Sequence, residues 1–182
     1  MGDSGQLQAN LIKKCIQCDP KSQMQLYEQY CQAMYRTAYN FVRQEAAAED
    51  LMQEAFIKAF QKLDHFDGKA SFGSWLKKIV INHCLDWLKK RKLRVVSMDY
   101  SHIEIADETN WEVHDTVSIE QILNAIEQLP EKYKIPLKLF LLEGYDHNEI
   151  AAILNITEVN SRSQVHRGKN KLKELLKQYQ YA

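Results

Sequence analysis

The stretch His147–Lys169, HNEIAAILNITEVNSRSQVHRGK, decides the fold of the C-terminal part of this 182-residue chain. Its first eight residues predict a short helix, and Asn155–Thr157 predicts a turn whose threonine caps a second, long helix. Apolar side chains recur where two crossing helices would bury them, and they are Ile150, Ala151, Leu154, Ile156 and Val165. The pattern is typical of a helix-turn-helix.

The exposed start of the second helix carries side chains that suit the major groove of DNA: Arg162, Ser163, His166 and Arg167. Arginine can make two parallel hydrogen bonds to guanine or hold a phosphate, while serine and histidine supply shorter polar contacts. Short patterns of this kind also arise by chance in helical proteins. Binding of DNA is therefore the favoured interpretation of this module, and a purely structural helical corner is the alternative.

Two further helices are expected before the helix-turn-helix. Ile119–Leu129 forms one and stops at Pro130, and Glu131–Leu142 forms the next, with Pro136 inside it or at a kink. Together these four helices predict a C-terminal domain spanning residues 119–182.

The net charge of zero hides a strong pattern along the chain. Residues 1–95 carry +5, residues 96–119 carry −6 and residues 120–182 carry +1. Two basic patches, Lys77–Arg94 and Asn160–Ala182, flank the acidic segment. Because the local field decides contact with a polyanion, the neutral total does not exclude nucleic acid as a partner. The acidic segment keeps neither helical nor strand periodicity, which predicts a linker over residues 96–118.

The N-terminal part, residues 1–95, is also predicted to be helical. Asp19-Pro20 is typical of a helix start, and the apolar stripe after it predicts one long helix or two successive ones. In Ala46–Leu63 the apolar residues fall on one helix face and polar residues on the other. A loop rich in small residues, Phe66–Ser74, follows, and Ser74 is expected to cap a helix with a buried stripe from Trp75 to Leu88.

Composition excludes several classes of protein. The chain is 45% hydrophobic and 26% charged, with 6 Gly and 3 Pro, which favours helices and short turns. It has no apolar run long enough for a membrane span and no secretory signal, so we expect a cytoplasmic protein without membrane insertion. Cys15 and Cys18 have a spacing that suits zinc or redox chemistry, but no second pair follows, and reduced thiols are the favoured interpretation.

Nothing in the sequence indicates an enzyme. A di-iron helical bundle would need Glu-x-x-His pairs on two helices, and none occurs. The histidines show no metal-binding spacing; they are His65, His83, His102, His114, His147 and His166. We therefore expect no catalytic residue, no metal and no cofactor.

Taken together, the two halves resemble the extracytoplasmic-function (ECF) group of bacterial sigma factors, in the sigma-70 family. The likeness to domain two lies in the motifs Ala48-Glu49-Asp50-Leu51, Gln53-Glu54-Ala55-Phe56, Ser71-Phe72, Trp75-Leu76, Ile79 with Asn82, and Asp86-Trp87-Leu88. The likeness to domain four lies in Leu129-Pro130, Glu149-Ile150-Ala151, Ser161-Arg162-Ser163-Gln164 and His166-Arg167-Gly168-Lys169. The resemblance covers nearly all of residues 20–178, and it is specific as a set although no single motif is.

The resemblance implies an all-α fold: a region 2 helical bundle and a region 4 helix-turn-helix, joined by a flexible acidic linker. It also implies the function of a sigma factor, which directs promoter recognition, DNA melting and transcription initiation. The implied partners are RNA polymerase core, promoter DNA and an anti-sigma factor. The alternative is a conventional helix-turn-helix regulator, which would leave the N-terminal loop and basic helix unexplained.

The resemblance also assigns roles to residues. Candidate polymerase contacts are Glu49, Asp50, Gln53 and Glu54. Candidate contacts to the −10 element are Lys69, Ser71, Phe72, Lys77, Lys78 and Asn82. Candidate contacts to the −35 element are Arg162, Ser163, His166 and Arg167. The chain departs from the family at Val159-Asn160-Ser161 and at Gly168, where an alanine is common, and a glycine inside a helix costs up to about 1 kcal/mol relative to alanine.

Overall fold

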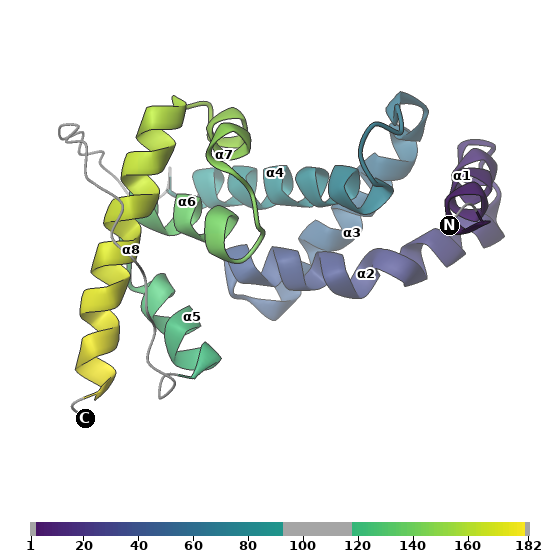
Figure 1. Ribbon diagram of the computed structural model, residues 1–182. Helices are drawn as coiled ribbons and strands as arrows, with labels where there is room; N and C mark the ends of the chain where they lie inside the picture. Colours follow the sequence, from purple (N-terminus) through teal and green to yellow (C-terminus); the bar gives the residue numbers. More distant parts are fainter. Residues whose placement is uncertain (1–2, 93–117, 181–182) are drawn as a thin grey trace. The chain divides into compact units, whose positions relative to one another are not determined.

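The computed structural model describes residues 3–92 and 118–180, and within this part all regular secondary structure is helical (Figure 1). The chain divides into two compact units, Met1–Ser97 and Met98–Ala182. The acidic linker predicted over residues 96–118 lies, apart from Ser118, outside the described residues, as do Leu93 and Arg94 at the end of the first basic patch.

Within residues 3–92 and 118–180, each unit contains four α-helices. The first unit contains α1 (Asp3–Ile16), α2 (Pro20–Val42), α3 (Glu45–Gln61), the short 3-10 helix η1 (Leu63–His65) and α4 (Phe72–Lys92). The second unit contains α5 (Ile119–Glu127), α6 (Glu131–Leu141), α7 (His147–Leu154) and α8 (Glu158–Gln180).

Helix α2 is a single helix of 23 residues. Its start is the predicted one: Asp19 is the N-cap, its carboxylate accepts a hydrogen bond of 2.9 Å from the Ser22 amide, and Pro20 occupies the first turn. It ends at Val42, and the following residue, Arg43, has a left-handed backbone (φ 52°) and donates its amide to the Tyr39 carbonyl. The sequence allowed one helix or two, and the continuous stripe of buried residues favours one.

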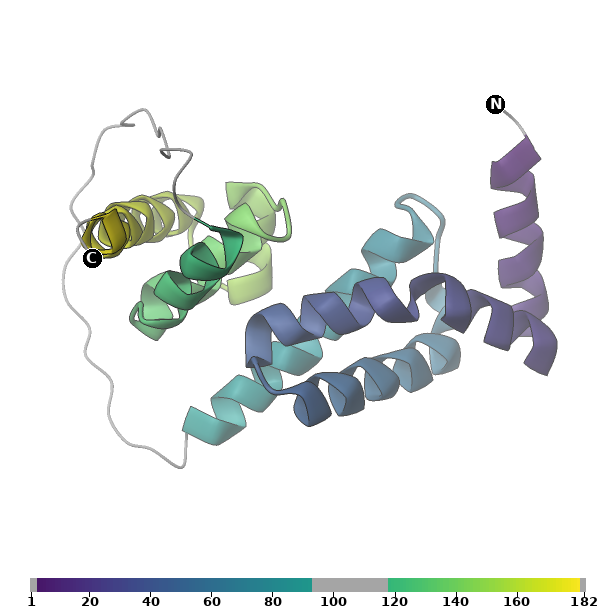
Figure 2. The same ribbon diagram turned by 90° about the horizontal axis from the view of Figure 1, so that it is seen from below.

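Helices α2, α3 and α4 lie side by side and bury one apolar stripe each (Figure 2). The buried stripe of α3 is the predicted one, although the helix ends at Gln61 and the chain then tightens into η1. The buried side chains of this core include Leu26, Met34, Leu51, Phe56, Leu63, Leu76, Val80, Ile81 and Cys84. Helix α1, which the sequence analysis did not predict, packs across the end of α2 through Leu11, Ile12 and Cys15.

The start of α4 differs from the prediction. The helix begins at Phe72, and Ser71 precedes it, with its Oγ accepting a hydrogen bond of 3.1 Å from the Ser74 amide. Ser71 therefore satisfies an amide of the first turn in the manner of an N-cap. The prediction that Ser74 caps the helix was wrong, because α4 already begins at Phe72 and Ser74 lies inside its first turn.

In the second unit, side-chain caps fix the ends of the helices. Ser118 starts α5 and Asp146 starts α7, each with a reciprocal capping box. Helix α5 ends two residues before the predicted Leu129, because the amides of Gln128 and Leu129 form tighter turns ahead of Pro130. Pro136 lies inside α6.

The predicted helix-turn-helix is present in α7 and α8. Helix α7 has the predicted bounds, and Asn155 ends it in the left-handed conformation (φ 55°). Thr157 Oγ1 accepts a hydrogen bond of 3.2 Å from the Asn160 amide, as expected for the cap of α8. Of the predicted core residues, Ile150 and Val165 are fully buried, and Ala151, Leu154 and Ile156 are half-buried.

A buried ion pair joins α5 to α6. Lys138 is 1% exposed, and its Nζ lies 2.6 Å from Glu127 Oε1, while Lys134 Nζ lies 3.6 Å from Glu127 Oε2. An unpaired charge at this depth would be strongly destabilising, so the pair fixes how these two helices meet.

The structure also gives a physical account of Gly168. This glycine is buried inside α8, and a Cβ added there would lie 3.4 Å from the Tyr133 carbonyl oxygen and 3.5 Å from Leu137 Cδ2. Both are close to ordinary van der Waals contact. The position therefore tolerates the alanine that the family commonly has.

We predict that Gly168→Ala raises the free energy of unfolding by about 0.5–1 kcal/mol, because alanine loses less backbone entropy in a helix. Urea unfolding followed by circular dichroism measures the change. The matched control is Gly144→Ala, which should destabilise the chain because Gly144 has a φ of +75°. A loss of stability in Gly168→Ala would show that α6 and α8 are packed too tightly for the added methyl group.

Candidate nucleic-acid and protein interfaces

The solvent-facing side of α3 carries the four residues predicted to contact polymerase. Glu49, Asp50, Gln53 and Glu54 are all exposed, at spacings of one, four and five residues that place them along one stripe. Gln53 Nε2 donates a hydrogen bond of 3.3 Å to Glu49 Oε1. We call this stripe the acidic face of α3. The structure therefore brings these four predicted residues together.

An exposed isoleucine continues the acidic face of α3. Ile57 is 58% exposed and follows Gln53 by four residues. The sequence analysis did not select it, although its position beside Phe56 and outside the apolar stripe was a signal. A large exposed apolar side chain at the end of an acidic stripe is typical of a protein-docking surface.

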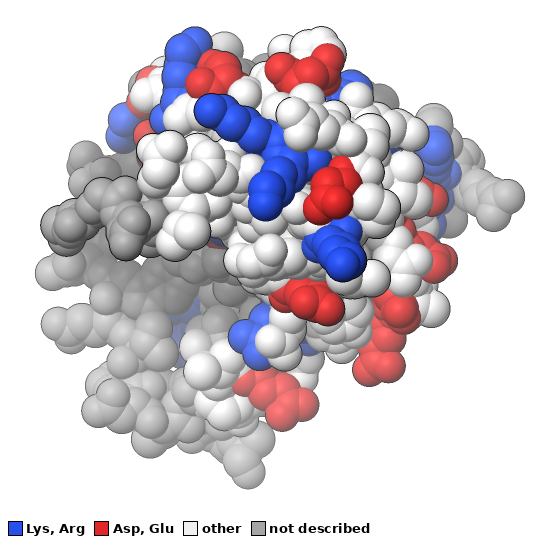
Figure 3. All heavy atoms as spheres, turned by 90° about the vertical axis from the view of Figure 1, so that its right-hand side faces the viewer, with Lys and Arg blue, Asp and Glu red and all other residues white. Residues whose placement is uncertain are grey.

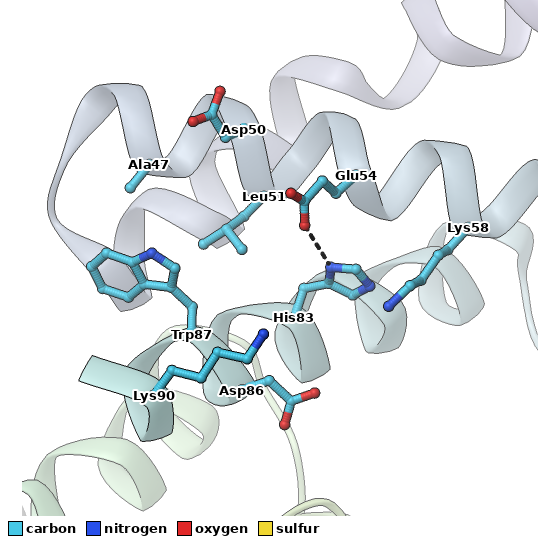
Figure 4. Close-up of a pocket in the computed structure, with 9 residues that line it drawn as sticks. All are labelled: Ala47, Asp50, Leu51, Glu54, Lys58, His83, Asp86, Trp87 and Lys90. Atoms are coloured by element: carbon cyan, nitrogen blue, oxygen red, sulfur yellow. Dashed lines mark ion pairs between the residues drawn. The ribbon is translucent and has the colours of Figure 1, made fainter. Parts of the chain in front are cut away.

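A cleft of about 360 Å³ separates part of α3 from α4 (Figure 4). Ala47, Leu51 and Trp87 line its apolar part. His83 projects into the cleft toward Glu54, and their Nδ1 and Oε2 atoms lie 3.6 Å apart. This contact joins the acidic face of α3 to the residue next to Asn82 on α4.

The His83 side chain is only 10% exposed. Burial lowers the pKa of His83 below its ordinary value of 6.5, and the charge of Lys58 lowers it further, whereas Glu54 partly opposes both effects. His83 is therefore mainly neutral near pH 7.

The loop between η1 and α4 is held by local hydrogen bonds. Asp67 Oδ1 accepts a 3.1 Å bond from the Lys69 amide, and its Oδ2 lies 3.0 Å from Lys69 Nζ. The hydrogen bonds from Lys69 lower the pKa of Asp67. Gly68 adopts a φ of +71°, which favours glycine at this turn. The predicted residues Lys69 and Ser71 are exposed in this loop.

The predicted role of Phe72 as a DNA contact needs a correction. Phe72 is 3% exposed, and its ring lies among those of Tyr30, Phe66 and Trp75, with centroids 5.2, 5.8 and 5.7 Å away. A ring in this position does not reach a nucleic acid on the surface. Phe72 instead supports the loop from below.

The outer side of α4 carries the other predicted −10 residues. Lys78 and Asn82 are exposed and four residues apart, so they lie one above the other on the helix. Lys77 is half-buried beside them. The loop and this side of α4 form a continuous run of chain with exposed cationic and amide groups.

The recognition helix α8 presents the predicted −35 residues unequally. Arg162 is exposed, and its Nε and Nη2 lie 3.1 and 2.6 Å from Glu158 Oε1. Ser163, His166 and Arg167 are half-buried, and His166 Nε2 lies 3.0 Å from Asn170 Nδ2. The sequence analysis missed the Glu158 contact, although a spacing of four residues on a helix predicts it.

A hydrogen bond fixes the crossing of α7 and α8. His147 Nδ1 lies 3.1 Å from the Oγ of Ser161, which is buried. The His147 ring also stacks on Phe140 of α6, with centroids 5.0 Å apart, and Lys169 Nζ lies 4.4 Å from the Phe140 ring centroid. Burial lowers the pKa of His147, and the charge of Arg162 adds to this effect. Ser161 and His147 thus set the angle at which α8 is presented.

Charge on one face of the molecule is mixed. Figure 3 views the side on which α1 lies in Figure 1, and several Lys and Arg side chains lie together near the top of the view. Asp and Glu side chains lie beside and below them. On such a face, single well-placed cationic groups matter more for contact with a polyanion than a broad positive field.

Among the described residues, no helix has the length and apolar character needed to cross a membrane. The same part of the chain holds no group of three or more metal-ligating side chains. The four cysteines are free thiols, with Cys15 and Cys84 buried. Burial raises the pKa of the Cys15 thiol, and the charge of Asp19 adds to this effect.

Comparison with known proteins agrees with the two-unit architecture. The family model for sigma-70 region 2 matches residues 26–94, and that for sigma-70 region 4 matches residues 119–172. The chain is 30% identical over 180 residues to the ECF RNA polymerase sigma factor SigW of Bacillus subtilis, covering 91% of this chain and 95% of SigW. It is 29% identical over 156 residues to the ECF RNA polymerase sigma factor SigE of Mycolicibacterium smegmatis, covering 84% of this chain and 60% of SigE.

A solved structure gives the same fold. The sigma factor RpoE of Bartonella quintana, crystallised with the anti-sigma factor NepR, superimposes with a TM-score of 0.61 at 24% identity, covering 85% of this chain and 96% of RpoE. The chain therefore belongs to the sigma-70 family, in its ECF group. It is an RNA polymerase sigma factor that directs transcription initiation.

Membership of this family decides two questions that the sequence analysis raised. Sigma factors are non-catalytic subunits of RNA polymerase, which agrees with the prediction that the chain is not an enzyme. A conventional helix-turn-helix regulator would not account for the region 2 match over residues 26–94. That alternative is therefore set aside.

The lowered pKa of His83 leads to a pH prediction. Because the folded pKa lies below the unfolded value, the contribution of His83 to stability is complete above pH 6.5 and is lost as pH falls through the folded pKa. We expect His83→Gln to reduce the fall in the urea midpoint between pH 7.5 and pH 5.5. An equal pH dependence in His83→Gln and the parent chain would contradict the expected role of burial.

Proposed function

We propose a division of labour between the segments of this sigma factor. Residues 1–95 bind RNA polymerase core and the −10 element, residues 96–118 connect the two units, and residues 119–182 read the −35 element. The observation that carries the proposal is that each folded unit buries its apolar side chains, and each exposed surface carries groups suited to one partner. These groups are carboxylates on α3, lysine and amide groups on the loop and α4, and arginines on α8.

The acidic face of α3 is the surface proposed to bind polymerase. Its three carboxylates are exposed, and Ile57 provides an apolar contact at one end of the stripe. Carboxylates next to an exposed apolar residue fit a basic partner surface with a matching apolar residue.

We predict that Asp50→Lys weakens binding to RNA polymerase core about tenfold or more, because it places a cation against a basic partner surface. Fluorescence anisotropy of the labelled chain with purified core measures the affinity. The control Glu28→Lys makes the same charge change on the exposed side of α2 and should bind normally. Normal binding by Asp50→Lys would remove the acidic face of α3 from the interface.

The loop and outer side of α4 are proposed to hold the opened −10 strand. Capture of an unpaired base needs polar groups for the base edge and cations along the backbone. Asn82 offers an amide with both donors and an acceptor, and Lys69, Lys77 and Lys78 are cations in its neighbourhood along the chain. Ser71 lies at the end of the same loop.

We predict that Asn82→Ala impairs promoter opening more than it impairs binding to core, since the amide is exposed and does not contribute to the helical core. Permanganate footprinting of unpaired thymines detects opening, and anisotropy reports core binding in the same preparation. Gln32→Ala, which removes an exposed amide from α2, is the control. Normal melting by Asn82→Ala would remove this residue from the mechanism.

The start of α8 is proposed to read the −35 element. Arg162 is the best-placed residue because it is exposed, and Glu158 holds its guanidinium in one orientation. Such pre-orientation reduces the entropy lost when the arginine binds a guanine edge. Ser163, His166 and Arg167 are half-buried and are proposed as flanking contacts.

We predict that Arg162→Ala reduces discrimination at one position of the −35 element by about 1–3 kcal/mol without unfolding the chain. Run-off transcription from promoters with single base changes measures the preference. Lys173→Ala removes an exposed cation further along α8 and should leave base preference intact. An unchanged preference profile in Arg162→Ala would contradict direct reading by this residue.

We also propose that an anti-sigma factor regulates this chain in the cytoplasm. RpoE of Bartonella quintana was crystallised with such a partner. In the present chain the acidic face of α3 and the start of α8 are exposed, so a protein that covers either surface would block polymerase or promoter binding.

A further inference from the structure

We propose that helix α1 and Tyr30 position the loop between η1 and α4 for binding the opened DNA strand. This inference rests on the proposed role of that loop at the −10 element. It extends that role to residues outside the loop, including a helix that precedes the region 2 match over residues 26–94.

The loop is closed at its base by aromatic rings. Phe66 lies at one end and Phe72 at the other, and their ring centroids are 5.8 Å apart in an edge-to-face arrangement. Trp75 contacts both rings, with centroids 5.5 and 5.7 Å away. Such contacts are each worth about 0.5–1.5 kcal/mol beyond the burial of area. The two ends of the loop are therefore held together, and a shift of this cluster would move the exposed residues of the loop.

Tyr30 of α2 supports the cluster from beneath. Its ring meets Phe72 edge-on, with centroids 5.2 Å apart. Gly73 allows this approach, because a Cβ at that position would lie 2.9 Å from Tyr30 Cε1. Any larger residue at position 73 would displace the tyrosine ring.

Helix α1 holds the other end of Tyr30. Gln8 Nε2 donates a hydrogen bond of 3.3 Å to the Tyr30 hydroxyl. Helix α1 is itself fixed, because Leu11, Ile12 and Cys15 are buried and the helix also contacts η1 directly before the loop. A continuous set of contacts thus runs from α1 through Tyr30 and Phe72 to the loop. No residue in this set needs to touch DNA, so Gln8, Tyr30 and Gly73 are positioning residues.

The test compares two affinities in reconstituted holoenzyme made from core and the full chain. The first probe is a labelled single-stranded oligonucleotide with the non-template −10 sequence of a promoter mapped by run-off transcription. The second probe is the duplex that carries the −35 element of the same promoter. Affinity for core is measured in parallel, because a general loss of folding would lower all three affinities together.

We expect Gly73→Ala to weaken binding of the single strand about three- to tenfold, in line with the loss of one or two ring contacts. Gln8→Ala should weaken it about two- to threefold and cause no further loss when combined with Tyr30→Phe, because both changes remove the same hydrogen bond. Affinities for core and for the −35 duplex should stay within about twofold of the parent. Tyr27→Phe is the matched control, since the Tyr27 ring packs on Phe56 of α3.

Unchanged single-strand binding in Gly73→Ala, or an equal loss in Tyr27→Phe, would overturn the inference. Additive losses in the combined Gln8 and Tyr30 variant would also overturn it. Failure of the proposed function has a different signature, because the unaltered holoenzyme would then not bind the single strand.

Discussion

Burial of one apolar stripe on each of α2, α3 and α4 is the constraint on which the first unit depends. On α3 the stripe includes Leu51 and Phe56, and on α4 it includes Leu76 and Val80. Because a helix can bury only one side in a three-helix core, the acidic residues of α3 and the Lys78 side of α4 must face solvent. The same packing that stabilises the unit therefore also determines which groups are available to partners.

In the second unit three short helices pack against the long helix α8, and specific polar contacts add to the burial of apolar side chains. The buried pair of Lys138 and Glu127 joins α5 to α6, and Ser161 with His147 sets the crossing of α7 and α8. A small core allows several arrangements of similar energy, and buried polar contacts favour the arrangement in which every group is paired. The recognition helix is thereby presented at one angle.

Much of this architecture was predictable from the sequence because local rules and packing agree. Helix α7 has its predicted bounds, and Asp19 and Thr157 cap the helices that they were expected to cap. Helix α1 was not predicted, although Leu7, Leu11, Ile12 and Cys15 recur at helical spacing. The spacing of Cys15 and Cys18 was considered for zinc or redox chemistry and not as part of a helical pattern.

Features that depend on tertiary contacts were not predictable. The burial of Phe72 depends on the rings of Tyr30 on α2 and Phe66 in the loop, and the support that Tyr30 receives from Gln8 joins residues that are 22 positions apart. The contact of Glu158 with Arg162 was predictable, because the two residues lie four positions apart on one helix. Sequence reasoning therefore located the candidate surfaces, and the structure assigned which of their residues face outward.

The central claim is that the two units act together on promoters as part of RNA polymerase. Run-off transcription with purified core and fragmented genomic DNA, with and without the full chain, tests it most directly. The account predicts discrete transcripts that require the chain and begin downstream of two separated sequence elements. A chain that neither associates with core nor yields such transcripts, even if it binds duplex DNA alone, would contradict the account.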